Sequence, residues 1–278
     1  MGDESSDLRE RFERDGFASG GLVLEPDEVR LLAEEMERFI DDGFRDRPTG
    51  VPQPIYRIDL GGGGADHLYQ IGNLWEVSEP FRRLVGHRRL VEAAVQATGT
   101  ARLQVWVDQV MYKPERHGAH FGWHQDGAYH LSVEPADRLF AAWIALDDAD
   151  VETGCMWMAP GSHRWGLRES QLLQYRHLAE VSDFTQLPGE RIAPEFASEW
   201  QGVRPCPVKA GEVHFHHAHT WHGSPTNRSG RRRRGYAIHF MRDGVRCATD
   251  QDVRIPLRPG MSMAEAGPGF PTVYPFPA

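Results

Sequence analysis

The sequence lacks several features that mark common functional classes. Its 278 residues hold no apolar run of about 18 residues, the length a membrane-spanning helix needs, and the polar first residues hold no signal-peptide core. Acidic residues outnumber lysine and arginine, and the resulting net charge of −9 is the reverse of the basic footprint typical of nucleic-acid-binding proteins. We therefore expect neither membrane insertion nor nucleic-acid binding.

Cysteine is scarce, and nucleotide-binding loops are missing. Cys155, Cys206 and Cys247 lie far apart and form no CxxC pair, which predicts reduced structural thiols in a cytoplasmic protein. Neither GxGxxG before a helix nor GxxxxGK[ST] occurs. The glycine run 61–64 belongs to a proline-rich segment, 47–66, that predicts a loop.

Helical patterns come first in the chain, and short strand-like runs follow. Residues 26–42 carry one apolar stripe behind Pro26, and a second helix is predicted at 79–98, ending at Gly99. After residue 100, runs rich in β-branched and aromatic residues occur at 101–112, 138–146, 155–160, 208–216 and 235–241. This order predicts a mainly β fold, a sandwich or barrel, with flanking helices packed outside it.

We expect one domain spanning residues 1–278. Its helical N-terminal part covers about 1–100, its barrel core about 101–245, and a C-terminal tail 246–278. A polar segment, about 165–203, interrupts the strand pattern and is expected to be a helical insertion or a lid.

Histidines near residue 124 are candidate metal ligands. His120 and His124 have the spacing of HExxH, but Phe121 stands where that motif carries its general base, and nearby glycines disfavour a helix. In an extended segment, His124 and Asp126 would instead share one face. With one distant histidine, the pair would form the 2-His-1-carboxylate triad of non-haem iron(II) oxygenases, which leaves positions open for a cosubstrate and dioxygen.

A second polar motif lies far downstream. His222 opens the sequence HGSPTN, and the arginine run 231–234 and the strand-like segment 235–241 follow it. An arginine at the head of a strand could turn into the barrel and hold a carboxylate with its planar fork. Arg233, 11 residues after His222, lies at the head of this strand-like segment, and a shift of one or two residues within the run stays open. The other arginines of the run are expected to face solvent.

Along most of its length the sequence resembles the phytanoyl-CoA dioxygenase family of Fe(II)/2-oxoglutarate-dependent oxygenases. The resemblance rests on FERDGF (12–17), DQVMYKP (108–114), WHQDGAY (123–129), AAWIALDDADVETGCMWMAPGSH (141–163) and the block 208–240. It implies a double-stranded β-helix, a jelly-roll or cupin-like barrel, in agreement with the order of the elements. Segment 165–203 matches no block of the family.

The resemblance also implies roles for individual residues. It assigns Fe(II) to His124, Asp126 and His222, the distal carboxylate of 2-oxoglutarate to Arg233 with Ser224, and further cosubstrate contacts to Gln109 and Trp143. His217 would support the site. Structural alternatives remain open, since Gln109 and Trp143 could pack in the core and Ser224 could form a turn. Packing or surface positions are expected for His117, His120, His214, His216, His219 and His239.

The resulting hypothesis is a hydroxylase of a small-molecule metabolite that uses Fe(II), 2-oxoglutarate and O2 and releases succinate and CO2. Asp126 argues against halogenation, which needs that carboxylate to be absent. Desaturation, epoxidation and cyclisation stay open. The family name suggests an acyl-CoA substrate, but no basic phosphate-binding patch accompanies the helices, and secondary metabolism or catabolism is favoured. From other classes, the alternatives are a zinc-dependent cupin-type hydrolase or isomerase and a non-catalytic binding protein.

Overall fold

The computed structural model describes residues 4–41, 56–59, 69–115, 120–168, 183–250, 255 and 257–277. Within these ranges the α-helices are α1 (Glu4–Asp15), α2 (Pro26–Asp41), α3 (Leu74–Val77), α4 (Glu79–Val85) and α5 (Arg88–Thr98). They all precede residue 100, as the sequence predicts for the helical part.

The described strands form antiparallel sheets. The large sheet has the order β1-β10-β7-β12-β4-β3-β2, with β14 also paired to β4, and the small sheet has the order β5-β11-β8-β9. The large sheet consists of β1 (Phe17–Leu22), β2 (Tyr56–Asp59), β3 (Tyr69–Gly72), β4 (Leu103–Lys113), β7 (Leu139–Ala145), β10 (Glu212–His217), β12 (Arg233–Arg242) and β14 (Thr272–Tyr274). The small sheet consists of β5 (Phe121–His124), β8 (Met156–Met158), β9 (Arg204–Cys206) and β11 (His222–Ser224), and a separate pair joins β6 (Val133–Glu134) to β13 (Arg246–Cys247).

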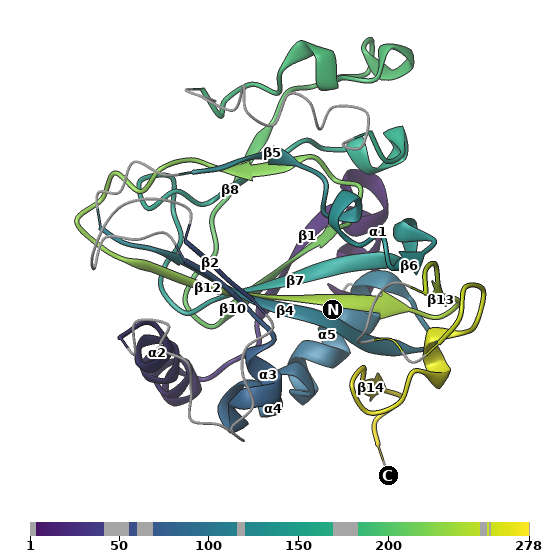
Figure 1. The fold of residues 1–278 in the computed structure, drawn as a ribbon. Helices are drawn as coiled ribbons and strands as arrows, with labels where there is room; N and C mark the ends of the chain where they lie inside the picture. Colours follow the sequence, from purple (N-terminus) through teal and green to yellow (C-terminus); the bar gives the residue numbers. More distant parts are fainter. Residues whose placement is uncertain are drawn as a thin grey trace.

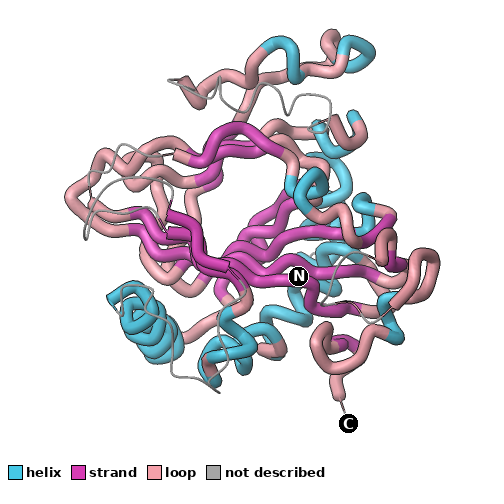
Figure 2. Tube along the Cα trace, viewed as in Figure 1, coloured by secondary structure: helices cyan, strands magenta, loops and turns pink. Residues whose placement is uncertain are grey.

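The elements stack in layers. Helices α2, α3 and α4 lie below the large sheet in Figure 1, and the small sheet with β5 and β8 lies above it. Figure 2 shows the same layers, with long cyan helices beneath the magenta strands and further short helical segments at the right and top. The mainly β prediction with helices outside is confirmed, and the two facing sheets match the jelly-roll expectation.

Alternation along the central strands separates a hydrophobic face from a polar one. In β12, Tyr236, Ile238 and Phe240 belong to the core cluster between the large sheet and the helices. In β10, Val213 and Phe215 do the same. Because successive side chains of a strand point to opposite faces, the residues between them face the small sheet. Fixing one face of these strands against the helices thus aims the other at the space between the sheets.

Two predictions about the N-terminal part are wrong in detail. The helix expected over 79–98 is two helices, because the chain leaves the helical conformation at Gly86 and is extended at His87 before α5 begins. The segment 47–66, expected to be a loop, contains strand β2, which pairs with β3 at the edge of the large sheet. A regular hydrophobic stripe continued through Gly86, so the stripe alone did not reveal the break. The glycine run 61–64 lies outside the described residues.

The interrupting segment is described from residue 183 onward and packs on the small sheet. There it holds short 3-10 turns, Gly189–Arg191 and Pro194–Phe196. The Phe184 ring stacks on Trp123 with centroids 5.8 Å apart, and Arg191 Nη1 donates to the Trp123 carbonyl at 2.5 Å. The segment is therefore anchored to β5, the strand that ends at His124.

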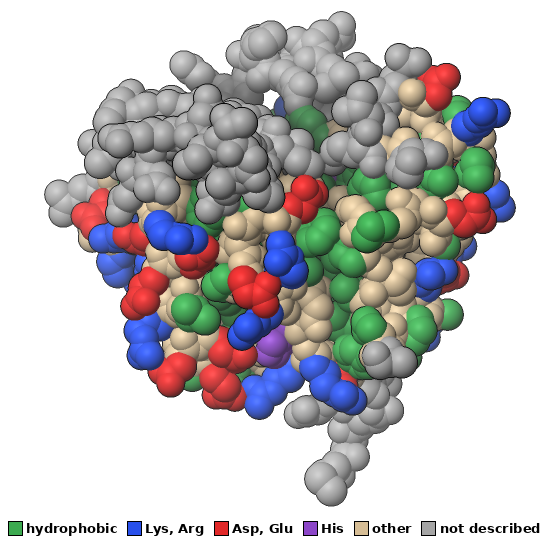
Figure 3. Space-filling model, turned by 60° about the horizontal axis from the view of Figure 1, so that its bottom comes forward, with side chains coloured by type: hydrophobic (Ala, Val, Ile, Leu, Met, Phe, Trp, Pro, Cys, Tyr) green, Lys and Arg blue, Asp and Glu red, His purple; other side chains and the backbone are tan. Residues whose placement is uncertain are grey.

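The surface charges, the helices and the cysteines of the described residues agree with what the composition predicts. On the face drawn in Figure 3, acidic and basic side chains are interspersed over the described residues. Among those residues, no helix has both the length and the apolar character needed to cross a bilayer. Cys155, Cys206 and Cys247 are buried free thiols.

Candidate active site

Three side chains predicted to bind one metal converge between the sheets. His124 ends β5 and His222 begins β11, and the two lie directly opposite each other in the antiparallel pair. Gln125 is extended, with φ −119° and ψ 125°, so the backbone carries Asp126 to the same side as His124 before a 3-10 turn begins. The alternation expected from the sequence therefore holds for this one step, although Asp126 itself lies beyond the strand.

The donor atoms of this triad are close enough to share one ion. Both Nε2 atoms, of His124 and of His222, lie 3.6 Å from Asp126 Oδ1, and the three ligand atoms lie within 4.8 Å of one another. His124 Nδ1 donates to the Gly122 carbonyl at 2.7 Å, and His222 Nδ1 donates to the Thr220 carbonyl at 2.9 Å. A carbonyl can only accept, so these bonds fix the tautomer in which each Nε2 presents its lone pair to the site.

Electrostatics also suits a divalent cation. Burial by itself would raise the pKa of Asp126, but His222, His239 and His216 together hold that pKa well below its ordinary range. Burial lowers the pKa of His222 well below its ordinary value. An anionic carboxylate beside a neutral imidazole is the protonation state that metal binding requires. The residues present therefore fit a resident divalent metal.

A further histidine holds the carboxylate. His216, on β10 of the large sheet, has its Nε2 at 3.0 Å from Asp126 Oδ2, and His239 Nδ1 lies 3.8 Å from the same oxygen. His216 is 2% exposed, and its ring centroid lies 4.4 Å from that of His222. Sequence reasoning treated His216 and His239 as packing or surface residues. Both are in fact part of the environment of Asp126, which leaves Oδ1 directed at the two ligand histidines.

Gln109 lies in a buried hydrogen-bonded chain beside the triad. Its Nε2 is 2.7 Å from His239 Nε2, and His239 Nδ1 is 3.3 Å from His130 Nε2. His130 Nδ1 in turn accepts a hydrogen bond from Trp106 Nε1 at 2.9 Å. This chain fixes the side chain of Gln109 on the face of β4 that looks toward the small sheet, as a cosubstrate contact would need.

Arg233 begins β12 and is 1% exposed. Its Nη1 donates to the Gly154 carbonyl at 2.7 Å and to Ser224 Oγ at 3.1 Å, while Nε has no hydrogen-bond partner among the described residues. Burial lowers the pKa of Arg233 to about 10. The guanidinium therefore stays charged at neutral pH and keeps an unused donor, which suits a carboxylate ligand.

Trp143 lies against this arginine. The Arg233 Cζ is 5.3 Å from the centre of the Trp143 ring, a cation–π contact, and Trp143 is 3% exposed on β7. A Cβ at Gly235 would stand 2.1 Å from the ring, so glycine is needed for the ring to occupy this place. Trp143 is thus both a core residue and a wall of the arginine site.

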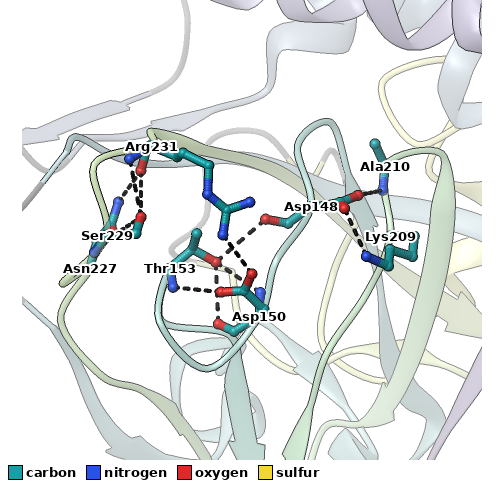
Figure 4. Close-up of polar contacts among 8 residues, drawn as sticks. All are labelled: Asp148, Asp150, Thr153, Lys209, Ala210, Asn227, Ser229 and Arg231. Carbon is teal, nitrogen blue, oxygen red and sulfur yellow. Dashed lines mark hydrogen bonds and ion pairs between the residues drawn. The ribbon is translucent and has the colours of Figure 1, made fainter.

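The turn before Arg233 decides which arginine points inward. Asn227 Oδ1 accepts from Ser229 N at 3.0 Å, and Asn227 Nδ2 donates to the Arg231 carbonyl at 2.6 Å (Figure 4). Arg231 then pairs with Asp150 at the surface, 2.6 Å away. Strand β12 begins only at Arg233, so Arg231 lies outside its alternation, and within the strand Arg233 shares with Ala237 the face that looks away from the helices.

The flanking arginines have different surroundings. The Arg232 side chain is 46% exposed, as expected for a solvent-facing residue. Arg234 is a correction, because its side chain is only 18% exposed and binds both oxygens of Asp147, with Nε at 2.8 Å and Nη2 at 2.6 Å. This pair explains why Asp147 is no candidate ligand: its carboxylate is already used.

The remaining candidate histidines lie elsewhere. His120 contacts the Phe184 ring, with centroids 5.7 Å apart, and His214 stacks with Phe17. His217 Nε2 donates to the Asp137 carbonyl at 2.9 Å, and no contact joins His217 to the triad within the described residues, so its supporting role stays a prediction. His117 lies outside the described residues.

Sequence reasoning missed two polar residues of this region, His216 and Lys113. His216 stands two positions from His214 on one face of β10, and such alternation of histidines in a buried strand could have indicated an inward pair. Lys113 lies in DQVMYKP, which the analysis cited only as a block of resemblance. It donates to Ser224 Oγ at 2.5 Å.

Comparison with known proteins gives consistent matches. The family model described as Phytanoyl-CoA dioxygenase (PhyH) matches residues 12–235. Phytanoyl-CoA dioxygenase domain-containing protein 1 from Bos taurus is 31% identical over 86% of this chain and 72% of its own length. The Mus musculus protein of that name is 30% identical over 63% of this chain, and the match spans only 57% of the mouse protein. Among solved structures, SnoN, a non-haem α-ketoglutarate-dependent epimerase from nogalamycin biosynthesis, superposes with a TM-score of 0.72 at 23% identity, covering 97% of this chain and 96% of SnoN.

Proposed function

Because the chain belongs to the phytanoyl-CoA dioxygenase (PhyH) family, we propose that it is an Fe(II)/2-oxoglutarate-dependent dioxygenase that hydroxylates a small-molecule metabolite. One observation carries the proposal: a His-Asp-His triad, buried at Asp126 and His222 and partly exposed at His124, and a buried arginine lie between the same two sheets. A metal triad alone would equally suit a hydrolase. The arginine adds a site for a carboxylate, which the oxygenase needs and a hydrolase does not.

In this proposal the triad His124, Asp126 and His222 holds the metal. Bound there together with 2-oxoglutarate and O2, Fe(II) would supply an oxidant strong enough for an unactivated C–H bond, with release of succinate and CO2. The chain's own contribution is orientation. His216 fixes one oxygen of the Asp126 carboxylate, and backbone carbonyls fix both ligand rings, so the donors are held before the metal arrives.

Arg233 would bind the distal carboxylate of 2-oxoglutarate, and Ser224 Oγ, which accepts from Arg233 Nη1, would hold the guanidinium in place beside it. Trp143 covers one face of the guanidinium and excludes water from it, which strengthens a charge-assisted bond at this place. Gln109, fixed by His239, would border the cosubstrate from β4. These assignments support hydroxylation over halogenation, because Asp126 occupies the ligand position that a halide would need.

An anaerobic visible spectrum tests the proposal. Protein loaded with Fe(II) and 2-oxoglutarate is expected to show a weak metal-to-ligand charge-transfer band that neither component gives alone. Folded, iron-loaded protein without such a band would contradict the oxygenase and favour the zinc hydrolase or binding-protein alternatives. As a second check, Asp126→Ala should abolish succinate formation coupled to a substrate, and coupled turnover by this variant would show that the ligand assignment is wrong.

A screen of small metabolites for stimulated succinate release would identify the substrate class. We propose a secondary or catabolic metabolite. The PhyH name also raises an acyl-CoA thioester, and it can be included as one arm of the screen. An acyl-CoA as the only stimulating compound would overturn the small-metabolite part of the proposal and leave the oxygenase assignment intact.

A further inference from the structure

Lys113 is a buried cation that the proposed mechanism has not used. It ends β4 directly opposite Arg233 in the register of β4 and β12, and it is 1% exposed. The chain contains only two lysines, Lys113 and Lys209, among its 31 basic residues. A lysine is almost never fully buried without a partner for its charge. Its place beside the arginine site therefore calls for an explanation.

The acceptors around Lys113 Nζ favour the charged ammonium. Nζ donates to the Ser224 carbonyl at 3.1 Å, to Ser224 Oγ at 2.5 Å and to the Pro225 carbonyl. Three acceptors match the three N–H groups of an ammonium, whereas a neutral amine has two. The face of the Phe121 ring, 5.4 Å from Nζ, adds a further contact favourable to a cation.

Lys113 and Arg233 meet on one hydroxyl. Ser224 Oγ accepts from Lys113 at 2.5 Å and from Arg233 Nη1 at 3.1 Å, while its own proton goes to the Gly154 carbonyl at 2.8 Å. The serine is thereby held in one orientation. The shared hydroxyl also holds the Lys113 ammonium and the Arg233 guanidinium close together in a part of the molecule that is buried from solvent.

No carboxylate among the described residues pairs with either cation. Asp147, whose charge raises the pKa of Arg233, is already bound by Arg234 at two oxygens. Burial and the neighbouring Arg233 both lower the pKa of Lys113, so the two charges oppose each other in the protein alone. An anion bound at Arg233, close to both charges, would relieve both the repulsion and the cost of burial.

We propose that Lys113 is a positioning residue that, with Arg233 and through Ser224, makes a two-cation site selective for 2-oxo acids with a second, distal carboxylate. The proposal rests on the proposed function. Lys113 sets the orientation of Ser224 and supplies the second positive charge, while Arg233 contacts the carboxylate. A 2-oxo acid of the same length without that carboxylate, such as 2-oxovalerate, would gain nothing from the pair.

Calorimetric binding to zinc-loaded protein tests this without turnover. Wild type, Lys113→Met and Lys209→Met are compared for 2-oxoglutarate and 2-oxovalerate. Lys209 is a suitable control because it is exposed and pairs with Asp148 at the surface (Figure 4). We expect Lys113→Met to weaken 2-oxoglutarate binding by roughly 10- to 100-fold, the range for losing a charge-assisted interaction, and to change 2-oxovalerate binding by less than about threefold.

The outcomes separate the two hypotheses. If zinc-loaded wild type does not bind 2-oxoglutarate, the proposed function fails, and this inference fails with it. If wild type binds 2-oxoglutarate and Lys113→Met binds each acid with the affinity of wild type, only the role of Lys113 is overturned. The same holds if the variant loses affinity for both acids by the same factor. The Lys209→Met variant should match wild type for both acids.

A measurement on the wild type keeps the proposal falsifiable should Lys113→Met not fold. Protein labelled with 13C at the lysine Cε gives two lysine signals, and Lys209→Arg identifies the signal of Lys113. Saturating zinc-loaded protein with 2-oxoglutarate should shift the Lys113 signal, and 2-oxovalerate should leave it in place. An unchanged Lys113 signal with bound 2-oxoglutarate, or equal shifts with both acids, would refute the two-cation site.

Discussion

Replacing His216 by phenylalanine tests whether this histidine prepares Asp126 for the metal. The bond from His216 Nε2 to Asp126 Oδ2 is 3.0 Å long, and the two side chains are 3% and 10% exposed. His239 Nδ1, at 3.8 Å from the same oxygen, is too distant to replace the bond without moving. Phenylalanine keeps the ring volume, so the substitution removes the hydrogen bond and leaves the packing of β10 nearly unchanged.

The magnitude follows from the burial of this bond. A hydrogen bond to a charged group contributes about 1.5–3 kcal/mol, and each 1.4 kcal/mol is a factor of about ten in a binding constant. We therefore expect His216→Phe to bind the metal roughly 10- to 100-fold more weakly. Loss of a residue that orients a metal ligand typically has an effect of this size.

Competition with a chromophoric chelator for cobalt(II) measures the affinity. The matched control is His214→Phe, two residues earlier on the same face of β10. His214 is likewise buried, but it stacks on Phe17 and makes no hydrogen bond to Asp126 within the described part of the chain. Equal cobalt affinities for folded wild type and His216→Phe, or equal losses in the two variants, would refute the reasoning.

Three further predictions concern the arginine site and the core. Arg233→Ala should raise the 2-oxoglutarate concentration needed for half-saturation by orders of magnitude, whereas Arg231→Ala should not; the reverse result in saturation kinetics would mean that the register is wrong. Gly235→Ala should destabilise the protein by about 1–3 kcal/mol, because the new Cβ meets Trp143 at 2.1 Å, and adding Trp143→Phe should restore part of the loss in urea unfolding. Burial raises the pKa of Asp108 to about 7, so a proton binds the folded form more tightly than the unfolded chain; its stabilising effect is complete below about pH 4 and is lost as the pH rises through 7. The unfolding free energy of wild type relative to Asp108→Asn should therefore fall between pH 5 and pH 8, and a constant difference would contradict this pKa shift.

The sequence predicted the parts of the fold that depend on local pattern. Strands β4, β7 and β12 each have an apolar face, so a run of apolar residues in the sequence marks each of them as a strand. The helix pair α4 and α5 was predicted as one helix, because the apolar stripe runs through the break at Gly86. Strand β2 was missed, since an edge strand in a proline-rich segment has little pattern of its own.

The candidate site also has features that local spacing indicates and features that depend on the tertiary structure. His124 and Asp126 are related by one extended residue, so their spacing suggested that they share a face, although HxD by itself is common and the downstream motif was needed to support the pair. Their pairing with His222 depends on the register of β5 and β11, for which the family resemblance supplied the expectation. The choice of Arg233 within its run depended on the turn held by Asn227 and Ser229.

What the sequence by itself determined, then, is the local pattern of the elements and, with the family resemblance, a set of candidate side chains for a metal and a carboxylate. The tertiary structure decided which neighbours support them. His216 reaches Asp126 from the opposite sheet, and Lys113 meets Arg233 on the hydroxyl of Ser224. No local pattern encodes these contacts, because they join residues far apart in the chain, and the desolvation that makes each of them strong exists only once the two sheets have closed.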